Sequence, residues 1–428
     1  MSYADFLAGK ERLAPSHGSE CSDGEVNPFL HPWQRRIVAW AVRRGRAALW
    51  EDTGLGKTVQ QIEWARLSAD RALIIAPLAV CAQTVREAAR LGVDARYCRA
   101  DDGGPGIQVT NYEMALRFDP ESFGAVVLDE ASILKQSDGK TRTALIRHFA
   151  ATPRRLTATA TPAPNDLEEL TNQAEFLGVA SRTEMLAAYF VHDDSGWRVK
   201  GHARGPMFRW MASWAVALSR PSDIGGSDTG YRLPGLDVIP HLLPVDVIPE
   251  GQLFATDLGG VGGRAQIRKA TLDARCEQAA KLICDDPGEP WLLWCGLNDE
   301  ARALERLVPD SVNVHGSQSP EEKAAAFLAF ADGQIRYLIT KPGIAAFGLN
   351  WQHCARMAFV GLSDSYEQYY QAIRRCYRYG QSRPVQAHVV LSELESRIAD
   401  NIAAKERGAA DMTRELVREM REAGELHD

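Results

Sequence analysis

A glycine-rich segment carries the clearest chemistry in this sequence. Residues 51–58 read EDTGLGKT; an apolar run precedes them and a helical pattern, VQQIEWARLSA, follows at once. Gly54 and Gly56 would let backbone N–H groups approach a phosphate, and the N-terminus of the following helix would favour its negative charge. Lys57 would then reach the β- and γ-phosphates of ATP, and Thr58 would ligate Mg²⁺. The alternative, a turn without a ligand, is disfavoured because a strand and a helix flank the segment.

An acidic pair follows a second apolar run. The segment VVLDEAS (126–132), preceded by Ala125, places Asp129 and Glu130 directly after four apolar residues. Ligands of open α/β sheets bind at the carboxyl ends of strands, where this pair would lie. Asp129 would hold Mg²⁺ through water, and Glu130 would orient and deprotonate an attacking water. An isolated Asp-Glu at a strand end is usually a solvated helix start, but a phosphate-binding loop in the same sheet favours the catalytic interpretation.

Short apolar runs alternate with helix-length segments in two regions of the chain. This pattern predicts parallel sheets buried on both faces, and so an α/β fold with two domains. The expected strands of the first domain are 47–50, 72–77, 107–111, 125–130 and 155–160, and those of the second are 290–296, 312–316, 336–341, 356–361 and 385–391.

The alternation breaks between the two regions. Residues 178–275 contain Gly- and Pro-rich pieces that predict loops, with helical pieces such as FRWMASWAVALS (208–219). We therefore expect an N-terminal domain over 1–177, an insertion or linker over 178–275, and a C-terminal domain over 276–428. The charged, Ala-rich tail from residue 393 has a helical pattern and is expected to pack across a domain surface.

Several motifs in this order resemble those of the Swi/Snf-type branch of the superfamily 2 helicases and DNA translocases, the wider DEAD/DEAH-box group. EDTGLGKT is similar to the family's D-E-x-G-L-G-K-T, which accounts for an acid in place of the usual first glycine. The other resembling segments are LHPWQRRIVAW (30–40), LIIAPLAV (73–80), VTNYEM (109–114), ATATPAPNDLEEL (158–170), LITKPGIAAFGLNWQ (338–352) and QAIRRCYRYGQ (371–381).

The resemblance implies two tandem RecA-like domains with MgATP in the cleft between them. It makes Gln34 the adenine contact, and Thr159 and Thr161 the link between the nucleotide and DNA. The residues expected to hold the DNA backbone are Pro77, Thr110, Asn111 and Lys341.

Two arginines complete the expected catalytic set of Lys57, Asp129 and Glu130. Arg375 and Arg378 are three residues apart and on a helix would share one face, from which both could reach a γ-phosphate. Guanidinium groups stabilise the charge of a phosphoryl group in transfer. Taken alone, such a pair is more often a solvated helix face.

The charge of the chain is acidic on average. It has 49 Lys plus Arg against 56 Asp plus Glu and a net charge of -7, which by itself argues against a nucleic-acid partner. The basic residues are clustered, however, and clusters of this kind bind phosphates without reading sequence. The three clusters are Arg35, Arg36, Arg43, Arg44 and Arg46; Arg198, Lys200, Arg204 and Arg209, interleaved with Trp197, Phe208 and Trp210; and Arg374, Arg375, Arg378 and Arg383. The first could equally be a helix face, and the aromatic residues of the second could equally be core.

The eight cysteines are scattered, with no C-x-x-C pair, so neither a zinc ribbon nor a disulfide framework is expected. No stretch reaches the roughly 18 apolar residues of a membrane span, and the N-terminal residues do not resemble a signal peptide. We expect a cytoplasmic protein of a bacterial or phage-infected cell, without a membrane partner.

These observations predict an ATP-dependent translocase or helicase that moves along duplex DNA by sequence-independent backbone contacts, with ATP and Mg²⁺ as cofactors. One alternative is a helicase that separates the strands of DNA or RNA. A further alternative is a non-catalytic clamp on DNA or protein, and the 178–275 insertion could hold a protein partner.

Overall fold

The apolar runs of the first region form neighbouring strands of one parallel sheet. The structure, a computed structural model, describes residues 13–136, 139–194, 196–244, 267–345, 350–363 and 365–424. In the first sheet the strands lie in the order β3-β4-β2-β5-β6-β1-β9, and every pairing is parallel. Their bounds are β1 (Arg46–Glu51), β2 (Arg71–Ala76), β3 (Ala95–Tyr97), β4 (Gly106–Asn111), β5 (Ala125–Asp129), β6 (Arg154–Ala158) and β9 (Ala215–Leu218). The sequence pattern predicts all of these except β3 and β9.

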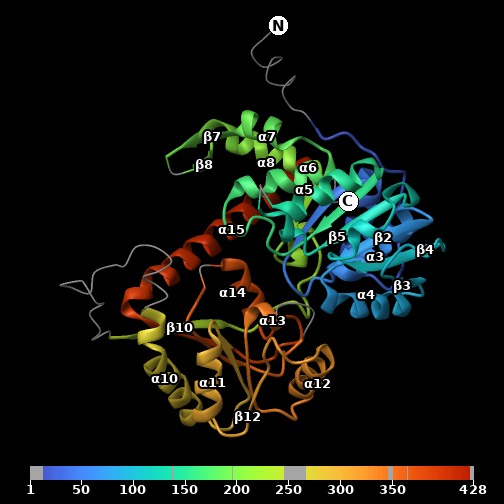
Figure 1. Ribbon diagram of the computed structural model, residues 1–428. Helices are drawn as coiled ribbons and strands as arrows, with labels where there is room; N and C mark the ends of the chain where they lie inside the picture. The colour runs from blue at the N-terminus through green and yellow to red at the C-terminus, as the bar shows by residue number, and fades with distance from the viewer. Residues whose placement is uncertain are drawn as a thin grey trace. The chain divides into compact units, whose positions relative to one another are not determined.

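Helices follow the strands of this sheet, as Figure 1 shows. Helix α2 packs on α3, α3 packs on α4, and α5 packs on α6. Almost every residue of the central strands is buried, so the sheet is the core of this part of the molecule. The helices are α2 (Pro32–Arg44), α3 (Lys57–Ser68), α4 (Leu78–Arg90), α5 (Lys140–His148), α6 (Leu170–Leu177), α7 (Arg182–Tyr189) and α8 (Arg204–Ala212).

The helical interpretation of residues 208–219 is wrong in its second half. Helix α8 ends at Ala212, and the chain then forms β9, which pairs with β1. All four residues of β9 are buried. The Ala and Leu of this segment favour a helix in isolation, but pairing with the open edge of the sheet buries the same apolar side chains and outweighs that preference.

A small antiparallel hairpin lies in the predicted insertion. It consists of β7 (Phe190–Asp193) and β8 (Gly196–Val199), between α7 and α8 (Figure 1). His192 and Trp197 face each other across the two strands, with ring centroids 4.9 Å apart.

The second sheet has six parallel strands in the order β10-β15-β14-β11-β13-β12. The sequence pattern predicts all of them except β10, the edge strand beside β15. Their bounds are β10 (Leu236–Leu243), β11 (Trp291–Cys295), β12 (Ser311–Asn313), β13 (Tyr337–Thr340), β14 (Arg356–Val360) and β15 (Val385–Ser392), and the helices are α10 (Leu272–Asp285), α11 (Asn298–Leu307), α12 (Pro320–Ala331), α13 (Pro342–Ala345) and α14 (Tyr366–Ile373).

The chain divides into two compact units, Met1–Tyr231 with Gly408–Asp428, and Arg232–Arg407. This division differs from the predicted segments, because β9 of the predicted insertion joins the first sheet and β10 joins the second. The two parallel sheets confirm the predicted α/β fold with two parallel-sheet domains. Across the described ranges, no helix is long and apolar enough to cross a membrane.

The tail forms one long helix, α15 (Ser396–Ala423), as its pattern predicts. From Gly408 onward it belongs to the first unit, where Met412, Leu416 and Met420 are buried. Glu415 forms an ion pair of 2.9 Å with Arg204 of α8. The expectation that the tail packs on a domain surface is therefore confirmed.

Candidate ATP-binding site

The glycine-rich segment forms the loop between β1 and α3. Strand β1 ends at Glu51 and helix α3 begins at Lys57. Gly54 and Gly56 have φ angles of 91° and 84°, in the left-handed region that favours glycine. A Cβ atom on Gly56 would lie 2.4 Å from Nε2 of Gln34, so the close approach of Gln34 also requires glycine there.

Lys57 is held inside this loop. Its Nζ donates hydrogen bonds to the backbone carbonyl oxygens of Glu51, at 2.7 Å, and Asp52, at 3.1 Å. Thr58 follows in the first turn of α3, where backbone N–H groups have no partner within the helix. A loop of this kind, with a cation and free N–H groups at a helix N-terminus, fits a phosphate chain.

Gln34 ties helix α2 to the loop. Its amide donates from Nε2 to the carbonyl oxygen of Leu55 at 2.8 Å and accepts at Oε1 from the backbone N–H of His31 at 2.9 Å. The residue before it, Trp33, packs against Tyr231, with ring centroids 5.8 Å apart. The expected adenine-contacting residue therefore lies against the phosphate loop, with aromatic rings nearby.

Asp129 and Glu130 lie where the sequence predicts, at the carboxyl end of β5. The Asp129 carboxylate accepts a hydrogen bond of 2.8 Å from Nε2 of Gln61 and another from the backbone N–H of Glu130, while its burial raises its pKa. A buried carboxylate beside Lys57 suits a divalent cation, since the cation would offset the desolvation of the charge.

The coupling segment reaches this acidic pair. The hydroxyl of Thr159 donates to Oε2 of Glu130 at 3.5 Å, and the backbone N–H of Thr161 donates to the Thr159 hydroxyl oxygen at 3.1 Å. Both threonines are buried. The structure thus brings the acidic pair and the coupling segment together within the first unit.

Two glutamines of α3 belong to this site, and sequence reasoning missed them. Gln60 donates to Oε2 of the fully buried Glu51 at 2.8 Å, and Gln61 donates to Asp129. Burial raises the pKa of the Glu51 carboxyl to about 7, although Lys57 and the bond from Gln60 oppose the shift. Their positions three and four residues after Lys57 were the available signal, since such spacing puts side chains on one helix face.

Three of the four residues expected to hold the DNA backbone lie at the same edge of the first sheet. Pro77 follows β2, and Thr110 and Asn111 end β4. Thr110 is fully buried, backbone included, and Asn111 is 4% exposed, whereas Tyr112 is half-buried and Glu113 is exposed. Oδ1 of Asn111 accepts a hydrogen bond of 2.9 Å from the hydroxyl of Tyr97.

The helical placement of Arg375 and Arg378 is wrong. Helix α14 ends at Ile373, and both arginines lie in the turns that follow. The backbone N–H of Arg375 bonds to the carbonyl of Ala372, three residues back, and the Arg375 carbonyl accepts from Trp351, so the chain leaves the helix to meet this neighbouring segment. Arg375 is buried, and burial lowers the pKa of Arg378 to about 10.

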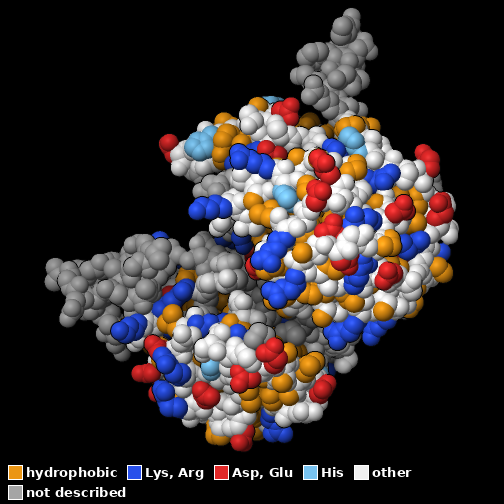
Figure 2. Space-filling model, turned by 45° about the vertical axis from the view of Figure 1, so that its right-hand side comes forward, with side chains coloured by type: hydrophobic (Ala, Val, Ile, Leu, Met, Phe, Trp, Pro, Cys, Tyr) orange, Lys and Arg blue, Asp and Glu red, His pale blue; other side chains and the backbone are white. Residues whose placement is uncertain are grey.

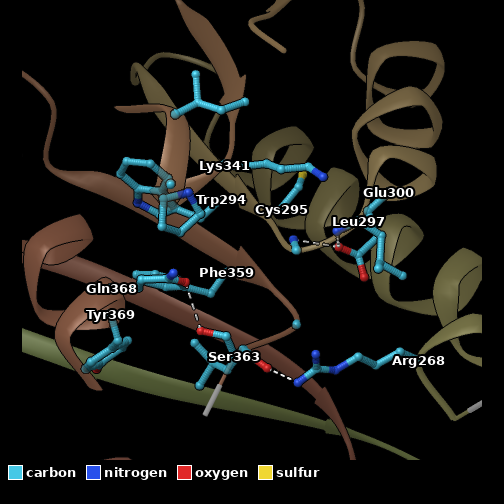
Figure 3. Close-up of a pocket in the computed structure, with 16 residues that line it drawn as sticks. Arg268, Trp294, Cys295, Leu297, Glu300, Lys341, Phe359, Ser363, Gln368 and Tyr369 are labelled. Atoms are coloured by element: carbon cyan, nitrogen blue, oxygen red, sulfur yellow. Dashed lines mark hydrogen bonds between the residues drawn. The ribbon is translucent and has the colours of Figure 1, made fainter. Parts of the chain in front are cut away.

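Lys341 lines a cavity of about 290 Å³ in the second unit, at the carboxyl ends of β11, β13 and β14 (Figure 3). Trp294 and Phe359 line one side of the cavity with aromatic rings. Arg268, which also lines it, forms an ion pair of 2.9 Å with Glu395. Within the described part of the chain, no acidic side chain forms an ion pair with Lys341. The neighbouring segment 346–349 of this motif lies outside the described residues.

Many arginines of the predicted basic clusters bind other parts of the protein. Arg43 and Arg46 donate to backbone carbonyl oxygens, and Arg209 pairs with Glu419 of α15 at 3.3 Å. Phe208 and Trp210 are buried core residues, whereas Trp197 of the hairpin is exposed. On the face in Figure 2, Lys and Arg side chains are interspersed with Asp and Glu and do not form one basic surface.

The fold and the site define a class of protein. A parallel sheet carries a glycine-rich loop with Lys57 after one strand, and an acidic pair after another strand of the same sheet. This is the arrangement of nucleotide-binding proteins with RecA-like α/β domains. No group of three or more potential metal-ligating His, Cys, Asp or Glu side chains occurs among the described residues.

Comparison with known proteins narrows this class. Residues 275–380, within the second unit, match the model of the helicase conserved C-terminal domain, which confirms the resemblance to helicases over that segment. The chain is also similar to a solved structure described as the Sulfolobus solfataricus SWI2/SNF2 ATPase core in complex with dsDNA, with 18% identity, a TM-score of 0.44, and coverage of 94% of this chain and 99% of that chain. No curated protein matches the chain.

Proposed function

We propose that this protein is an ATP-dependent DNA translocase of the Swi/Snf type, which hydrolyses ATP and moves along duplex DNA by sequence-independent backbone contacts. The observation that carries the proposal is the joint placement of Lys57, Asp129, Glu130 and Thr159 at one edge of the first sheet. The helicase C-terminal domain at 275–380 supports it.

The residues of the first unit fit MgATP. Lys57 and the N–H groups of the loop bind the β- and γ-phosphates, and Gln34 binds the adenine ring. Thr58 and the buried Asp129 hold Mg²⁺, which neutralises phosphate charge when bound. Glu130 holds the attacking water and accepts its proton, while Thr159 fixes one carboxylate oxygen at 3.5 Å.

Arg375 and Arg378 of the second unit are proposed to stabilise the charge of the transferring phosphoryl group. Pro77, Thr110, Asn111 and Lys341 are proposed to hold the DNA backbone. Because phosphate contacts dominate such binding, the affinity for DNA falls steeply as salt increases.

An ATPase assay with and without duplex DNA tests the proposal. We expect duplex DNA to stimulate hydrolysis, and both Lys57→Ala and Glu130→Gln to lower the stimulated rate at least about a hundredfold. Glu121→Gln, an exposed change in the short helix at Pro120–Ser122, is the matched control and should leave the rate unchanged. If duplex DNA gives no stimulation and Glu130→Gln matches the wild type, the protein is a clamp without turnover.

Strand separation is the second candidate, and the β7–β8 hairpin favours it. Trp197 of this hairpin is 37% exposed, and a base could stack on its ring beside His192. A triplex-displacement assay and a fork-opening assay, on DNA and on RNA, separate the two functions. Displacement without fork opening is the result expected of a translocase; fork opening without displacement would replace that function with unwinding.

A further inference from the structure

One hydrogen bond joins the expected nucleic-acid segment to the acidic pair. The hydroxyl of Tyr112 donates to the backbone carbonyl oxygen of Asp129 at 2.6 Å. Tyr112 is the first residue after β4, whereas Asp129 is the last residue of β5, and β2 lies between these strands in the sheet. Strand β2 ends just before Pro77, which has no N–H to donate, so Tyr112 supplies a donor at this edge.

The bond acts on a strained part of the backbone. Glu130 has φ 53° and ψ 53°, and it is one of only two non-glycine residues with positive φ in the described part of the chain. Such conformations cost roughly 1–3 kcal/mol and persist only where the surroundings hold them.

The carbonyl that Tyr112 binds belongs to the peptide group that joins Asp129 to Glu130. The N–H of the same peptide group donates to the Asp129 carboxylate. Rotation of this planar group would move the Asp129 carboxylate and the Glu130 side chain together, because the group connects both residues. The Tyr112 hydroxyl therefore fixes the orientation of both acids without touching a reacting atom.

In the sequence, Tyr112 directly follows Thr110 and Asn111, the last two residues of β4. We propose that Tyr112 is a positioning residue: nucleic acid bound beside the end of β4, where Tyr112 is half-buried and Glu113 exposed, fixes Tyr112, and Tyr112 in turn holds Glu130 in its orientation for hydrolysis. This inference rests on the proposed function, since it supplies a route by which DNA stimulates the ATPase.

Tyr112→Phe tests the inference because it removes only the hydroxyl. We expect the KM for ATP to stay within about twofold, and the kcat at saturating DNA to fall about 3–10-fold, the range for one lost hydrogen bond. The ratio of the kcat at saturating DNA to the kcat without DNA should fall as well. The matched control is Tyr337→Phe, which removes a hydroxyl bonded to the carbonyl oxygen of Pro287 at 3.3 Å in the second unit and should keep the wild-type ratio.

The possible outcomes separate the hypotheses. A Tyr112→Phe variant that melts at a lower temperature but keeps the wild-type ratio has lost only a structural bond, and this overturns the inference alone. If the variant fails to fold, Tyr112→Trp, which keeps a ring but places its N–H donor elsewhere, must also lower the ratio or the inference is overturned. A wild-type protein with no ATPase activity overturns the proposed function, and this inference with it.

Discussion

Gln61 donates a hydrogen bond from Nε2 to Oδ1 of Asp129 across 2.8 Å, and both side chains are buried. The bond links the helix after the phosphate loop to the strand that carries the acidic pair. It opposes the effect of burial, which raises the pKa of Asp129, and so favours the charged form that a cation requires.

Gln61→Leu should therefore weaken the use of Mg²⁺. Without the amide donor, the Asp129 carboxylate is harder to ionise, and hydrogen bonds to charged groups contribute about 1.5–3 kcal/mol. We expect the Mg²⁺ concentration at half-maximal ATP hydrolysis to rise at least about tenfold, measured by titration at fixed ATP. Gln83→Leu, a half-buried change on α4, is the control; an equal Mg²⁺ requirement in both variants would refute the role of Gln61.

Glu51→Gln should change the pH dependence of stability. Burial raises the pKa of Glu51 from 4.5 to about 7 in the folded chain, so the folded state binds more protons than the unfolded state between these values. Stability therefore falls as pH rises from about 4.5 to 7. The variant lacks this loss, and we expect it to be more stable than the wild type at pH 7.5, by up to about 3 kcal/mol, and similar at pH 4.5.

Urea unfolding of the full chain without nucleotide, at several pH values, measures this difference. Glu121→Gln serves as the exposed control and should keep the wild-type pH profile. A parallel pH profile for Glu51→Gln and the wild type would show that folding does not raise the pKa of Glu51.

Glu300→Gln should destabilise the second unit strongly. Glu300 and Arg275 form an ion pair of 2.7 Å in which both side chains are almost completely buried, and Oε2 of Glu300 also accepts from the N–H groups of Gly296 and Leu297. Neutralising the acid leaves Arg275 buried without its partner charge, which costs about 3–5 kcal/mol.

The same helix offers the control for this prediction. Asp299 and Arg302 form an ion pair with both side chains more than 60% exposed, and exposed pairs contribute about 0–1 kcal/mol. Thermal unfolding of Asp299→Asn should therefore differ little from the wild type. Similar melting temperatures for Glu300→Gln and Asp299→Asn would contradict the importance of the buried pair.

A histidine pair should make the second unit sensitive to acid. His241 of β10 and His388 of β15 lie 2.9 Å apart between ring nitrogens. Burial, His241 and Arg356 lower the pKa of His388 to about 4, although Asp286 opposes them. The folded state therefore binds fewer protons than the unfolded state below pH 6.5, so stability should decrease as pH falls from 6.5 toward 4.

His388→Gln should reduce this acid sensitivity. The comparison is the change in melting temperature between pH 7.5 and 5 for the variant, the wild type and His202→Gln, an exposed control in the first unit. An unchanged slope in His388→Gln would show that other groups cause the acid loss.

Sequence reasoning predicted most of the strands and the placement of the chemistry-bearing residues at strand ends. It succeeded for Asp129 and Glu130 because they directly follow a continuous apolar run, and for Lys57 because a short glycine-rich loop joins it to another such run; local order along the chain decides both placements. It failed for β9 and β10. An edge strand forms where the edge of a sheet has a strand left to pair with, and the local sequence pattern of the segment does not show whether such a strand is present.

The arginine motif shows the same limit. The spacing of Arg375 and Arg378 suits a helix, yet the Arg375 carbonyl bonds to Trp351, a residue 24 positions earlier, and the helix ends first. The basic cluster around Arg204 and Arg209 was likewise a candidate for DNA contact. In the structure these arginines form ion pairs with Glu415 and Glu419 of α15, about 200 residues later in the chain.

The sequence by itself determined the glycine-rich loop, the position of the acidic pair and the two α/β sheets, since each depends on short-range order and on apolar periodicity. Only the tertiary structure decided that Gln61 and Tyr112 form hydrogen bonds with Asp129. It also decided that burial raises the pKa of Glu51 to about 7, and that acidic side chains of the distant helix α15 pair with basic side chains of α8. These relations arise when strands far apart in the chain pack side by side, because burial then sets charge and geometry together.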